Sequence, residues 1–452
     1  MTSYIEKVLS LTGGNSREEA LQLIFRIRVS GDSCGLQPEL VQEVLSDETP
    51  LGDLYQWSLG EDRRKDGAHY TPDSLAVEVV RAALEPAFAS LWKGDPVAYE
   101  KSLLGLRVLD PAMGAAMLLV NAAREIAREI AWVRVYGEPQ PPSHFEWITN
   151  PDLPWSPELQ GHADDVIHEV IANCCYGVDL SPVVVDIAKY LLWEEVALRC
   201  QVKPEKSFLD SNLRCGNSLF HVNRDEVEQF RLELEDQCNA WDLLTLPDVT
   251  LDERWLWDAA FMRTYGILDV DVGYADPTPE QLANRDVLAK RASQMGVFHW
   301  EFEFPKFHVI VANPPFIGDR NLRAVLSESG VKFISRHLGH TVDLCSFFIR
   351  AFDSWLDKRN GVFGVIATNS IAEGKNRRAV LVPMLAEGQF EIYRSCRTRD
   401  WPGEAMVSIA TVHARRTNNP ELSAAYRRIV QVFDEPNAID LEEDLEAIED
   451  EV

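Results

Sequence analysis

The chain has 452 residues, enough for two or three domains or for one large catalytic domain with additions. Its hydrophobic content is 46% and its charged content 26%, and no apolar run reaches the ~18–20 residues of a membrane helix, which argues against a membrane protein. The N-terminus, MTSYIEKVLS, lacks the apolar core of a signal peptide, so we expect a cytoplasmic protein. The formal net charge of −28 should repel nucleic acid unless positive charge is concentrated locally or supplied by a partner.

The cysteines argue against a metal centre and against a disulfide framework. Eight cysteines occur without any CxxC pair, so no zinc site is predicted. Cys174 and Cys175 are adjacent in an apolar run, which favours core positions over ligand positions.

The first part of the chain is predicted to be helical. Residues 1–65 carry helical spacing in EEALQLIFRIRV and PELVQEVL and form the expected N-terminal helical region. The polar stretch GAHYTP then leads into a further helix, for which Thr71 or Asp73 is the expected N-cap, with Pro72 near the first turn.

From about residue 103 short β-rich runs alternate with helical runs. RVLDPAM, CCYGVDL, LRCGNSLF, FHVIVANPPF, GVFGVIATNS, EIYRSC and VSIATVHA are the predicted strand segments, and AAMLLVNAAREIAREIAWV and PVVVDIAKYLLWEEVALR are the clearest helices. This alternation predicts an α/β fold with a doubly wound, mostly parallel sheet. Two insertions are expected, near 136–160 and 221–300, and residues 416–452 form an acidic C-terminal tail.

Two predicted strands end in an acid that is followed by a helix. In VLDPAMGAA, residues 108–116, Asp110 precedes small residues, as in turns where a ligand approaches bare backbone at the carboxyl edge of a sheet. In YGVDLSP, residues 176–182, Asp179 is placed to accept hydrogen bonds from ribose hydroxyls. The alternatives are a structural turn at the first motif and a helix cap at Asp179.

A third run ends in CGNSLF, residues 215–220. Asn217 or Ser218 could hold the edge of an adenine, with Leu219 or Phe220 against its face. On the sequence alone an ordinary polar turn is the favoured interpretation of this segment.

The ANPPF motif, residues 312–316, is the sharpest signal. Asn313 offers a carbonyl acceptor, and the backbone carbonyl after it precedes a proline, which restricts its position. Two such acceptors can bind one exocyclic amine and align its lone pair with an electrophilic methyl group, so no strong base is required. Phe316 could then stack on the base that carries the amine.

The ordered motifs GAHYTP, LDPAMG, YGVDL, CGNSLF, ANPPF, VFGVIATNS and WPGEAMVSIATVHARR resemble the amino-group DNA methyltransferases, and specifically the gamma-class adenine methyltransferases of restriction–modification and phage-defence systems. The resemblance covers residues 66–415, the expected catalytic domain. It implies a class I methyltransferase fold, S-adenosyl-L-methionine as methyl donor, and the exocyclic amine of a flipped DNA adenine as acceptor.

The resemblance also assigns residues. The target-base pocket would comprise Asn313, Pro314, Pro315 and Phe316, with a second aromatic from SFFIRAF, residues 346–352. Tyr70, Thr71 and Pro72 would border the methionine part of the cofactor, Asp110, Ala112, Met113 and Gly114 would form the first cofactor turn, Asp179 and Leu180 would meet ribose and adenine, and Asn217 with Ser218 would approach the adenine amine.

The chain departs from the family pattern in two places. The first cofactor motif usually ends in GSG or GTG, whereas here it reads Gly114, Ala115 and Ala116, which adds a methyl group where the helix packs closely. Single-chain members of the family carry a target-recognition domain after the catalytic fold, whereas about 37 residues follow Arg415 in the sequence given. We therefore expect DNA recognition from a separate specificity subunit or another defence-system protein, or from a remainder of the polypeptide.

Local basic clusters remain as candidates for DNA contacts. They comprise Arg63, Arg64 and Lys65; Lys375, Arg377 and Arg378; and Arg394, Arg397 and Arg399. The last two clusters lie near the predicted catalytic edge, where phosphate contacts would position a strand, although a solvated face explains each cluster equally well.

Three other interpretations stay open. Methylation of cytosine N4 uses the same chemistry, although that family more often begins its tetrapeptide with Ser. Protein glutamine methyltransferases also use an NPP-aromatic motif, but they are compact chains without the HYTP loop. The chain could also be a degenerate subunit that binds cofactor or DNA without catalysing transfer. Ala116 in the cofactor motif and the excess of acidic residues favour this interpretation, whereas the intact ANPPF motif argues against it.

Overall fold

A computed structural model gives the structure of the chain. It describes residues 3–11, 17–30, 33–46, 49, 51–58, 70–140, 156–199, 205–237, 253–265, 289–338, 341–386, 390–402 and 407–417. Within these ranges no helix combines the length and apolarity that crossing a lipid bilayer requires. The basic cluster at 63–65, most of the acidic tail and parts of both predicted insertions lie outside the described residues.

Seven strands form one sheet in the order β3-β2-β1-β4-β5-β7-β6. Neighbouring strands are parallel except β7, which runs antiparallel to both β5 and β6. Their bounds are β1 Val108–Asp110, β2 Cys175–Asp179, β3 Leu213–Cys215, β4 Val309–Ala312, β5 Val362–Thr368, β6 Phe390–Asp400 and β7 Ser408–Arg416. The predicted doubly wound, mostly parallel sheet is therefore confirmed. Each predicted strand segment overlaps one of these strands, and β6 and β7 extend beyond the segments predicted for them.

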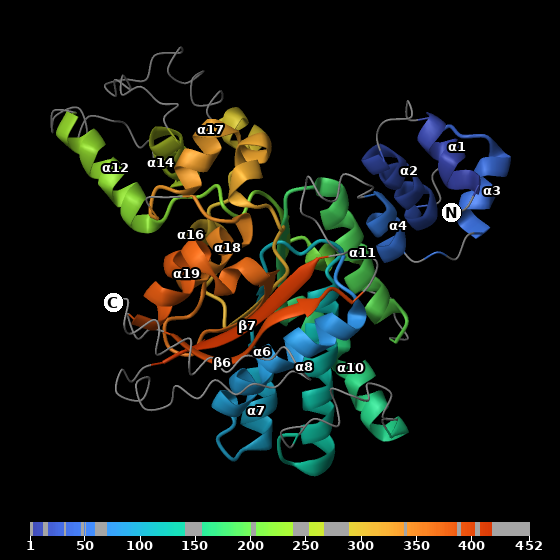
Figure 1. Ribbon diagram of the computed structural model, residues 1–452. Coiled ribbons are helices and arrows are strands. Elements are labelled where there is room, and N and C mark those ends of the chain that lie inside the picture. Colours follow the sequence, from blue (N-terminus) through green and yellow to red (C-terminus); the bar gives the residue numbers. More distant parts are fainter. Residues whose placement is uncertain are drawn as a thin grey trace, which may run out of the picture.

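Helices cover both faces of the sheet (Figure 1). The strand side chains alternate between two apolar cores. In β4, Val309 and Val311 join one core while Ile310 and Ala312 join the other. Continuous apolar runs are what strands buried on both faces require. The first face carries α6 (Asp73–Leu91), α7 (Pro96–Leu103), α8 (Met117–Tyr136), α10 (Pro157–Cys174) and α11 (Pro182–Ala197).

The second face carries the helices of the longer insertion and of the C-terminal part. They are α12 (Arg224–Gln237), α14 (Glu253–Tyr265), α16 (Trp300–Glu303), α17 (Leu322–Ile334), α18 (Leu344–Trp355) and α19 (Gly374–Ala386). Short 3-10 turns lie at Lys206–Leu209, Asp319–Asn321 and Asn369–Ala372.

The N-terminal helical region packs against the α/β fold. It contains α1 (Ser3–Leu11), α2 (Arg17–Ser30), α3 (Pro38–Ser46) and α4 (Leu51–Ser58), which lie beside α11 in Figure 1. Its apolar core includes Ala115 from the loop after β1 and Val183, Val184 and Ile187 from α11. These shared core residues hold the region against the edge of the sheet where β1 and β2 end.

Two local expectations can now be compared with the structure. Cys174 and Cys175 are buried, as predicted. The expected cap of α6 is wrong, because the N-cap is Pro72 and no side chain caps the helix. Thr71 is instead turned toward Asn313, and Asp73 accepts a hydrogen bond from Asn121.

Candidate active site

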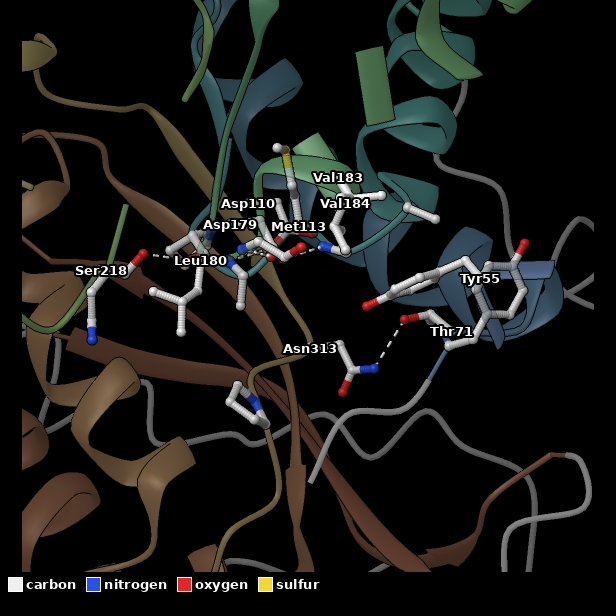
Figure 2. A pocket seen from close by; sticks show the side chains of 18 of the residues that line it. Tyr55, Thr71, Asp110, Met113, Asp179, Leu180, Val183, Val184, Ser218 and Asn313 are labelled. Atoms are coloured by element: carbon white, nitrogen blue, oxygen red, sulfur yellow. Dashed lines mark hydrogen bonds between the residues drawn. The ribbon is translucent and has the colours of Figure 1, made fainter. Parts of the chain in front are cut away.

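A cavity of about 1000 Å³ opens at the carboxyl edge of the sheet, where β1 and β4 lie side by side although they are far apart in sequence (Figure 2). Chain order reverses at this point, and ligands of open α/β sheets bind at such reversals. Loops after β1, β2, β3 and β4 line it together with residues of the N-terminal helices. The cavity therefore brings together the strand ends at which the sequence predicts the site.

The loop after β1 folds tightly around Asp110. This side chain accepts a hydrogen bond from the backbone N–H of Ala112 at 3.1 Å, and Met113 N–H donates to the carbonyl of Val178 in β2 at 3.1 Å. Gly114 has a φ of +50°, and a Cβ there would lie 3.7 Å from the ring of Tyr55. Glycine thus supplies both the left-handed backbone and the thin wall on which the cavity depends.

Asp110 is 1% exposed, and its burial raises the pKa of the carboxyl to about 8. The nearby carboxylate of Asp179 adds to this rise, whereas the hydrogen bond from Ala112 opposes it. Asp110 is therefore largely protonated at neutral pH, so its carboxyl can donate as well as accept a hydrogen bond.

Asp179 connects two loops of the cavity wall. Its Oδ2 accepts from the backbone N–H of Gly114 at 3.0 Å, and its Oδ1 accepts from the N–H of Ser181 at 3.0 Å. Ser181 is the N-cap of α11, and no side chain caps that helix. The alternative interpretation of Asp179 as a helix cap is therefore wrong. Its neighbour Leu180 lines the cavity with it.

The loop after β3 is held against both β1 and the end of the longer insertion. Ser218 Oγ donates to the carbonyl of Pro111 at 2.5 Å, and the Asn217 N–H donates to the carbonyl of Gly296 at 2.6 Å. Asn217, Ser218 and Leu219 line the cavity. Phe220 does not, because its ring packs within the aromatic cluster of the second face, which includes Phe261, Tyr265 and Phe333.

The ANPPF motif follows β4 directly. Asn313 and Pro315 line the cavity, and Asn313 Nδ2 donates to Thr71 Oγ1 at 3.0 Å (Figure 2). Pro314 is buried. Phe316 is not among the residues that line the cavity, and its ring contacts Trp401 edge to face with the centroids 6.2 Å apart.

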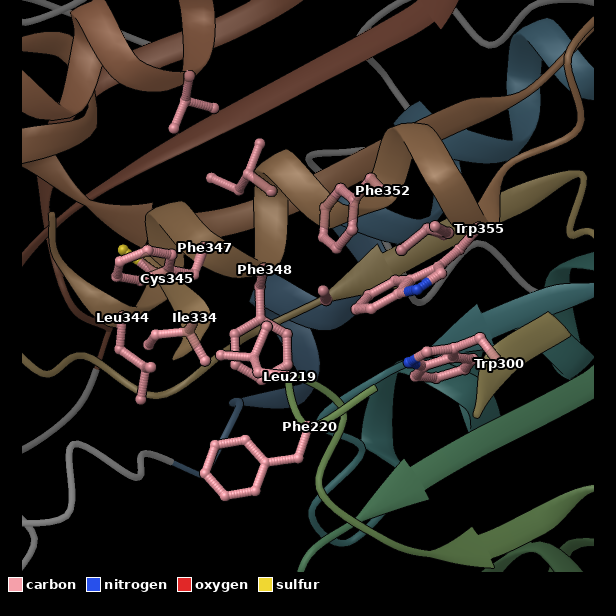
Figure 3. Packing of buried hydrophobic residues seen from close by; sticks show 14 of the residues in the cluster. Leu219, Phe220, Trp300, Ile334, Leu344, Cys345, Phe347, Phe348, Phe352 and Trp355 are labelled. Carbon is pink, nitrogen blue, oxygen red and sulfur yellow. The ribbon is translucent and has the colours of Figure 1, made fainter. Parts of the chain in front are cut away.

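Helix α18 contributes the aromatic ring of Phe348 to the cavity lining. Figure 3 shows its ring beside Leu219, while Phe352 and Trp355 continue along α18 toward Trp300. Of the aromatics in SFFIRAF, only Phe348 contributes to the described lining.

A hydrogen-bonded network around Asp343 fixes α18 relative to the ANPPF loop. Asp343 accepts from the N–H of Asp319 at 3.2 Å, from Asn376 Nδ2 at 2.9 Å and from Ser370 Oγ. The N–H of Leu344 donates to the carbonyl of Ile317 at 2.8 Å. Because these bonds span the loop, the end of β5 and the start of α19, the position of Phe348 is coupled to that of the motif.

In the two basic clusters that the structure describes, Lys375, Arg394, Arg397 and Arg399 form ion pairs. Arg399 Nη1 donates to both carboxylate oxygens of Glu78, each at 2.9 Å. Arg397 Nη2 lies 3.5 Å from Glu373 Oε1. Lys375 pairs with Asp319. Arg377 and Arg378 lie on the first turns of α19, and Arg378 is exposed.

The N-terminal helices also contribute to the cavity, which the sequence did not predict. Arg17 and Leu21 of α2, together with Tyr55 and Ser58 of α4, line the cavity beside the predicted Tyr70 and Thr71. Their spacings of four and three residues place each pair on one helix face. That pattern indicates a buried helix face, but it does not predict that this face packs against the loop after β1.

Comparisons with known proteins support the resemblance. The sequence profile of the Eco57I restriction-modification methylase family matches residues 173–394. RM.MjaORFECS2P of Methanocaldococcus jannaschii, described as a type II restriction enzyme and methyltransferase, is 24% identical over 202 residues, which cover 37% of this chain and 15% of the relative.

Two solved structures match the chain at low sequence identity and with TM-scores below 0.5. The DNA complex of the type IIL restriction-modification enzyme MmeI is 14% identical, with a TM-score of 0.44 and coverage of 85% of this chain and 43% of MmeI. The M protein of the type I restriction enzyme EcoKI is 13% identical, with a TM-score of 0.39 and coverage of 92% and 61%. The chain thus spans less than two thirds of each of these relatives. The family profile and the archaeal relative confirm the predicted resemblance: this chain is related to the methylases of restriction-modification systems.

Proposed function

We propose that the chain is the catalytic subunit or domain of a DNA adenine-N6 methyltransferase that uses S-adenosyl-L-methionine in a restriction–modification or phage-defence system. The observation that carries the proposal is the position of Asn313. The end of β4 delivers its carboxamide to the wall of the cavity, and Thr71 binds its amide nitrogen.

The cavity fits the proposed cofactor at both of its ends. Asp179 is held by two backbone N–H groups beside Leu180 and Asn217, a donor and acceptor set suited to a ribose and an adenine edge. At the other end, Gly114 adopts a left-handed backbone with a φ of +50°, which glycine takes without strain, beside the ring of Tyr55. When bound, S-adenosyl-L-methionine supplies an electrophilic methyl group.

The residues of the ANPPF motif would orient the acceptor amine. Because Nδ2 of Asn313 donates to Thr71, its Oδ1 is the atom that would accept from an exocyclic amine. The carbonyl of Pro314 precedes Pro315 and would accept the second proton of the same amine. Two acceptors in fixed positions align the nitrogen lone pair without a strong base.

An aromatic ring in the cavity would hold the flipped base. Phe348 lines the cavity, and the Asp343 network couples its helix to the ANPPF loop. Phe316, which follows Pro315 directly, is the second candidate ring. Stacking on such rings is sequence-tolerant, so it positions a base without reading it.

We further propose that a partner supplies DNA recognition. The net charge of −28 opposes binding to a polyanion, and Lys375, Arg397 and Arg399 already pair with carboxylates. A specificity subunit, or a further segment of the same polypeptide, would provide the positive surface and the base contacts.

The experiment is a transfer assay with methyl-labelled S-adenosyl-L-methionine and unmethylated DNA, run with the chain alone and with proteins encoded by neighbouring genes. Enzymatic digestion and mass spectrometry of the nucleosides should detect N6-methyladenine. N4-methylcytosine as the sole product would replace adenine with cytosine as the target. Cofactor binding without methyl transfer under every condition would support the degenerate-subunit interpretation, and a methylated protein in place of DNA would overturn the proposal.

A further inference from the structure

We infer that the N-terminal helical region closes one end of the cofactor cavity and that Arg17 binds a carboxylate there, namely the carboxylate of the amino-acid moiety of the cofactor. The inference rests on the proposed function, because it assigns a residue to the cofactor of that reaction. Nothing in the resemblance or in the matched family region, residues 173–394, assigns a role to this part of the chain.

Two helices present side chains to the cavity from this region. Arg17 and Leu21 lie four positions apart on α2, and Tyr55 and Ser58 lie three positions apart on α4. Each pair therefore lies on one helix face. The two faces together form a wall of the same cavity that Asp110, Asp179 and Asn313 line.

This wall is in direct contact with the loop after β1 and with α11. The ring of Tyr55 lies 3.7 Å from the position of a Cβ on Gly114. Ala115 from the same loop is 3% exposed and belongs to the apolar core of the N-terminal helices, as do Val183 and Val184 of α11. The distance from Arg17 to the loop after β1 is thus fixed by a shared core.

The guanidinium of Arg17 is oriented by its neighbours. Its Nη1 donates to the carbonyl of Trp57 at 3.2 Å, and its Cζ lies 5.5 Å from the centroid of the Trp57 ring. Among the described residues no carboxylate forms an ion pair with it. The remaining N–H groups are therefore able to bind an anion in the cavity.

Charge complementarity selects the occupant. Among the described residues that line the cavity, Arg17 is the only lysine or arginine, whereas the lining carboxyls Asp110 and Asp179 lie at the ends of β1 and β2. Asp179, Leu180 and Asn217 would take the adenosine end. The wall formed with Tyr55 and Gly114 then meets the amino-acid end, whose carboxylate matches the fork of a guanidinium.

The test compares two ligands that differ by one group, S-adenosyl-L-methionine and its decarboxylated analogue, by calorimetric titration of the full chain. For the wild type we expect tighter binding of the carboxylate-bearing ligand. Arg17→Gln should lower the affinity for S-adenosyl-L-methionine by about tenfold to a hundredfold, the range expected for a charge-assisted hydrogen bond. The affinity for the decarboxylated analogue should stay nearly unchanged. Arg17→Lys should recover part of the loss, because charge remains while the fork is lost.

Arg26→Gln is the matched control, because Arg26 is an exposed arginine on the same helix and does not line the cavity. It should bind both ligands as the wild type does, and thermal melting of every variant reports folding. Equal affinity of Arg17→Gln and wild type for S-adenosyl-L-methionine would overturn the inference, as would an equal loss for both ligands. Failure of the wild type to bind either ligand would refute the proposed function itself, and Arg17 would then have no cofactor to bind.

Discussion

The side-chain amide of Asn313 donates a hydrogen bond to the hydroxyl of Thr71, 242 positions earlier in the chain, at 3.0 Å. Thr71 is 7% exposed and lines the cavity, so water has little access to compete for this bond. The bond joins the motif that would hold the acceptor amine to the wall that would border the methyl donor. It also orients the carboxamide, because the nitrogen faces Thr71 and the oxygen faces away (Figure 2).

Replacing Thr71 with Val should therefore lower the rate of methyl transfer more than it lowers cofactor affinity. Val keeps the shape of Thr but cannot accept the hydrogen bond of Asn313. The loss of one buried bond corresponds to about 1–3 kcal/mol, and thus to roughly tenfold or more in rate. Single-turnover transfer and calorimetric binding measure the two effects separately.

Thr71→Ser is the control for this substitution. It retains the hydroxyl, so its rate should stay close to that of the wild type. If Val and Ser variants transferred methyl groups equally fast, the hydrogen bond would have no part in orienting Asn313.

Asn313→Ala should abolish methyl transfer and leave cofactor binding nearly intact. The substitution removes the proposed acceptor for the target amine, whereas the proposed adenosine end of the cavity is formed by the loops after β2 and β3. Labelled transfer to DNA and titration with S-adenosyl-L-methionine test the two statements. Activity equal to that of the wild type would remove Asn313 from its proposed role.

Local sequence patterns sufficed for the sheet and for most of its site residues. Val309–Ala312 is a continuous apolar run that stops at Asn313 because prolines follow, and Asp110 and Asp179 end their strands before helices. In a mostly parallel sheet these ends share one edge. The strand-end residues of the cavity follow from that geometry without knowledge of any tertiary contact.

The contacts that the sequence could not provide are those between distant segments. Arg399 and Glu78 are 321 positions apart, and no local pattern distinguishes an arginine that pairs with a helix from one that faces a phosphate. The same holds for Arg17 and Tyr55, whose helices show a buried face but no sign of its partner. Phe348 is one of several aromatics on α18, and only packing separates it from the others.

Ala116 occupies a left-handed conformation, with a φ of 62°, where the family pattern has glycine. Relief of this strain in Ala116→Gly amounts to about 1 kcal/mol, and the loss of a fully buried methyl group offsets it by a similar amount. We therefore expect Ala116→Gly to change the free energy of unfolding by less than about 1 kcal/mol.

Ala116→Val should destabilise the fold by more than about 2 kcal/mol, because a β-branched residue is strained there and overfills the core. Urea unfolding measures both, and a neutral Val variant would contradict the assigned backbone conformation.

Asp110→Asn should make the fold less sensitive to alkaline pH. The pKa of Asp110 is raised from about 3.8 to about 8 in the folded chain, so folding favours the protonated carboxyl. The contribution of this carboxyl to folding stability is fully present below pH 3.8 and is lost as the pH rises through about 8.

Asn at position 110 keeps the acceptor for the N–H of Ala112 and carries no charge. Between pH 5 and pH 8.5 the variant should gain on the order of 3 kcal/mol relative to the wild type. Parallel urea curves for the two proteins over this range would show that Asp110 ionises freely.

Arg399 and Arg378 should respond differently when DNA binding is measured with the complete complex. Arg399 is engaged by both oxygens of Glu78, so Arg399→Gln should lower the melting temperature and leave the salt dependence of DNA affinity unchanged. Arg378 is exposed at the start of α19, near the end of β5, so Arg378→Gln should lower the melting temperature less than Arg399→Gln does. If Arg378 contacts a phosphate, the slope of log K against log salt should decrease by about 1, since one fewer counterion is released. A reduced slope for Arg399→Gln would mean that this arginine exchanges Glu78 for a phosphate in the complex, and an unchanged slope for both variants would assign the basic cluster to the solvated surface.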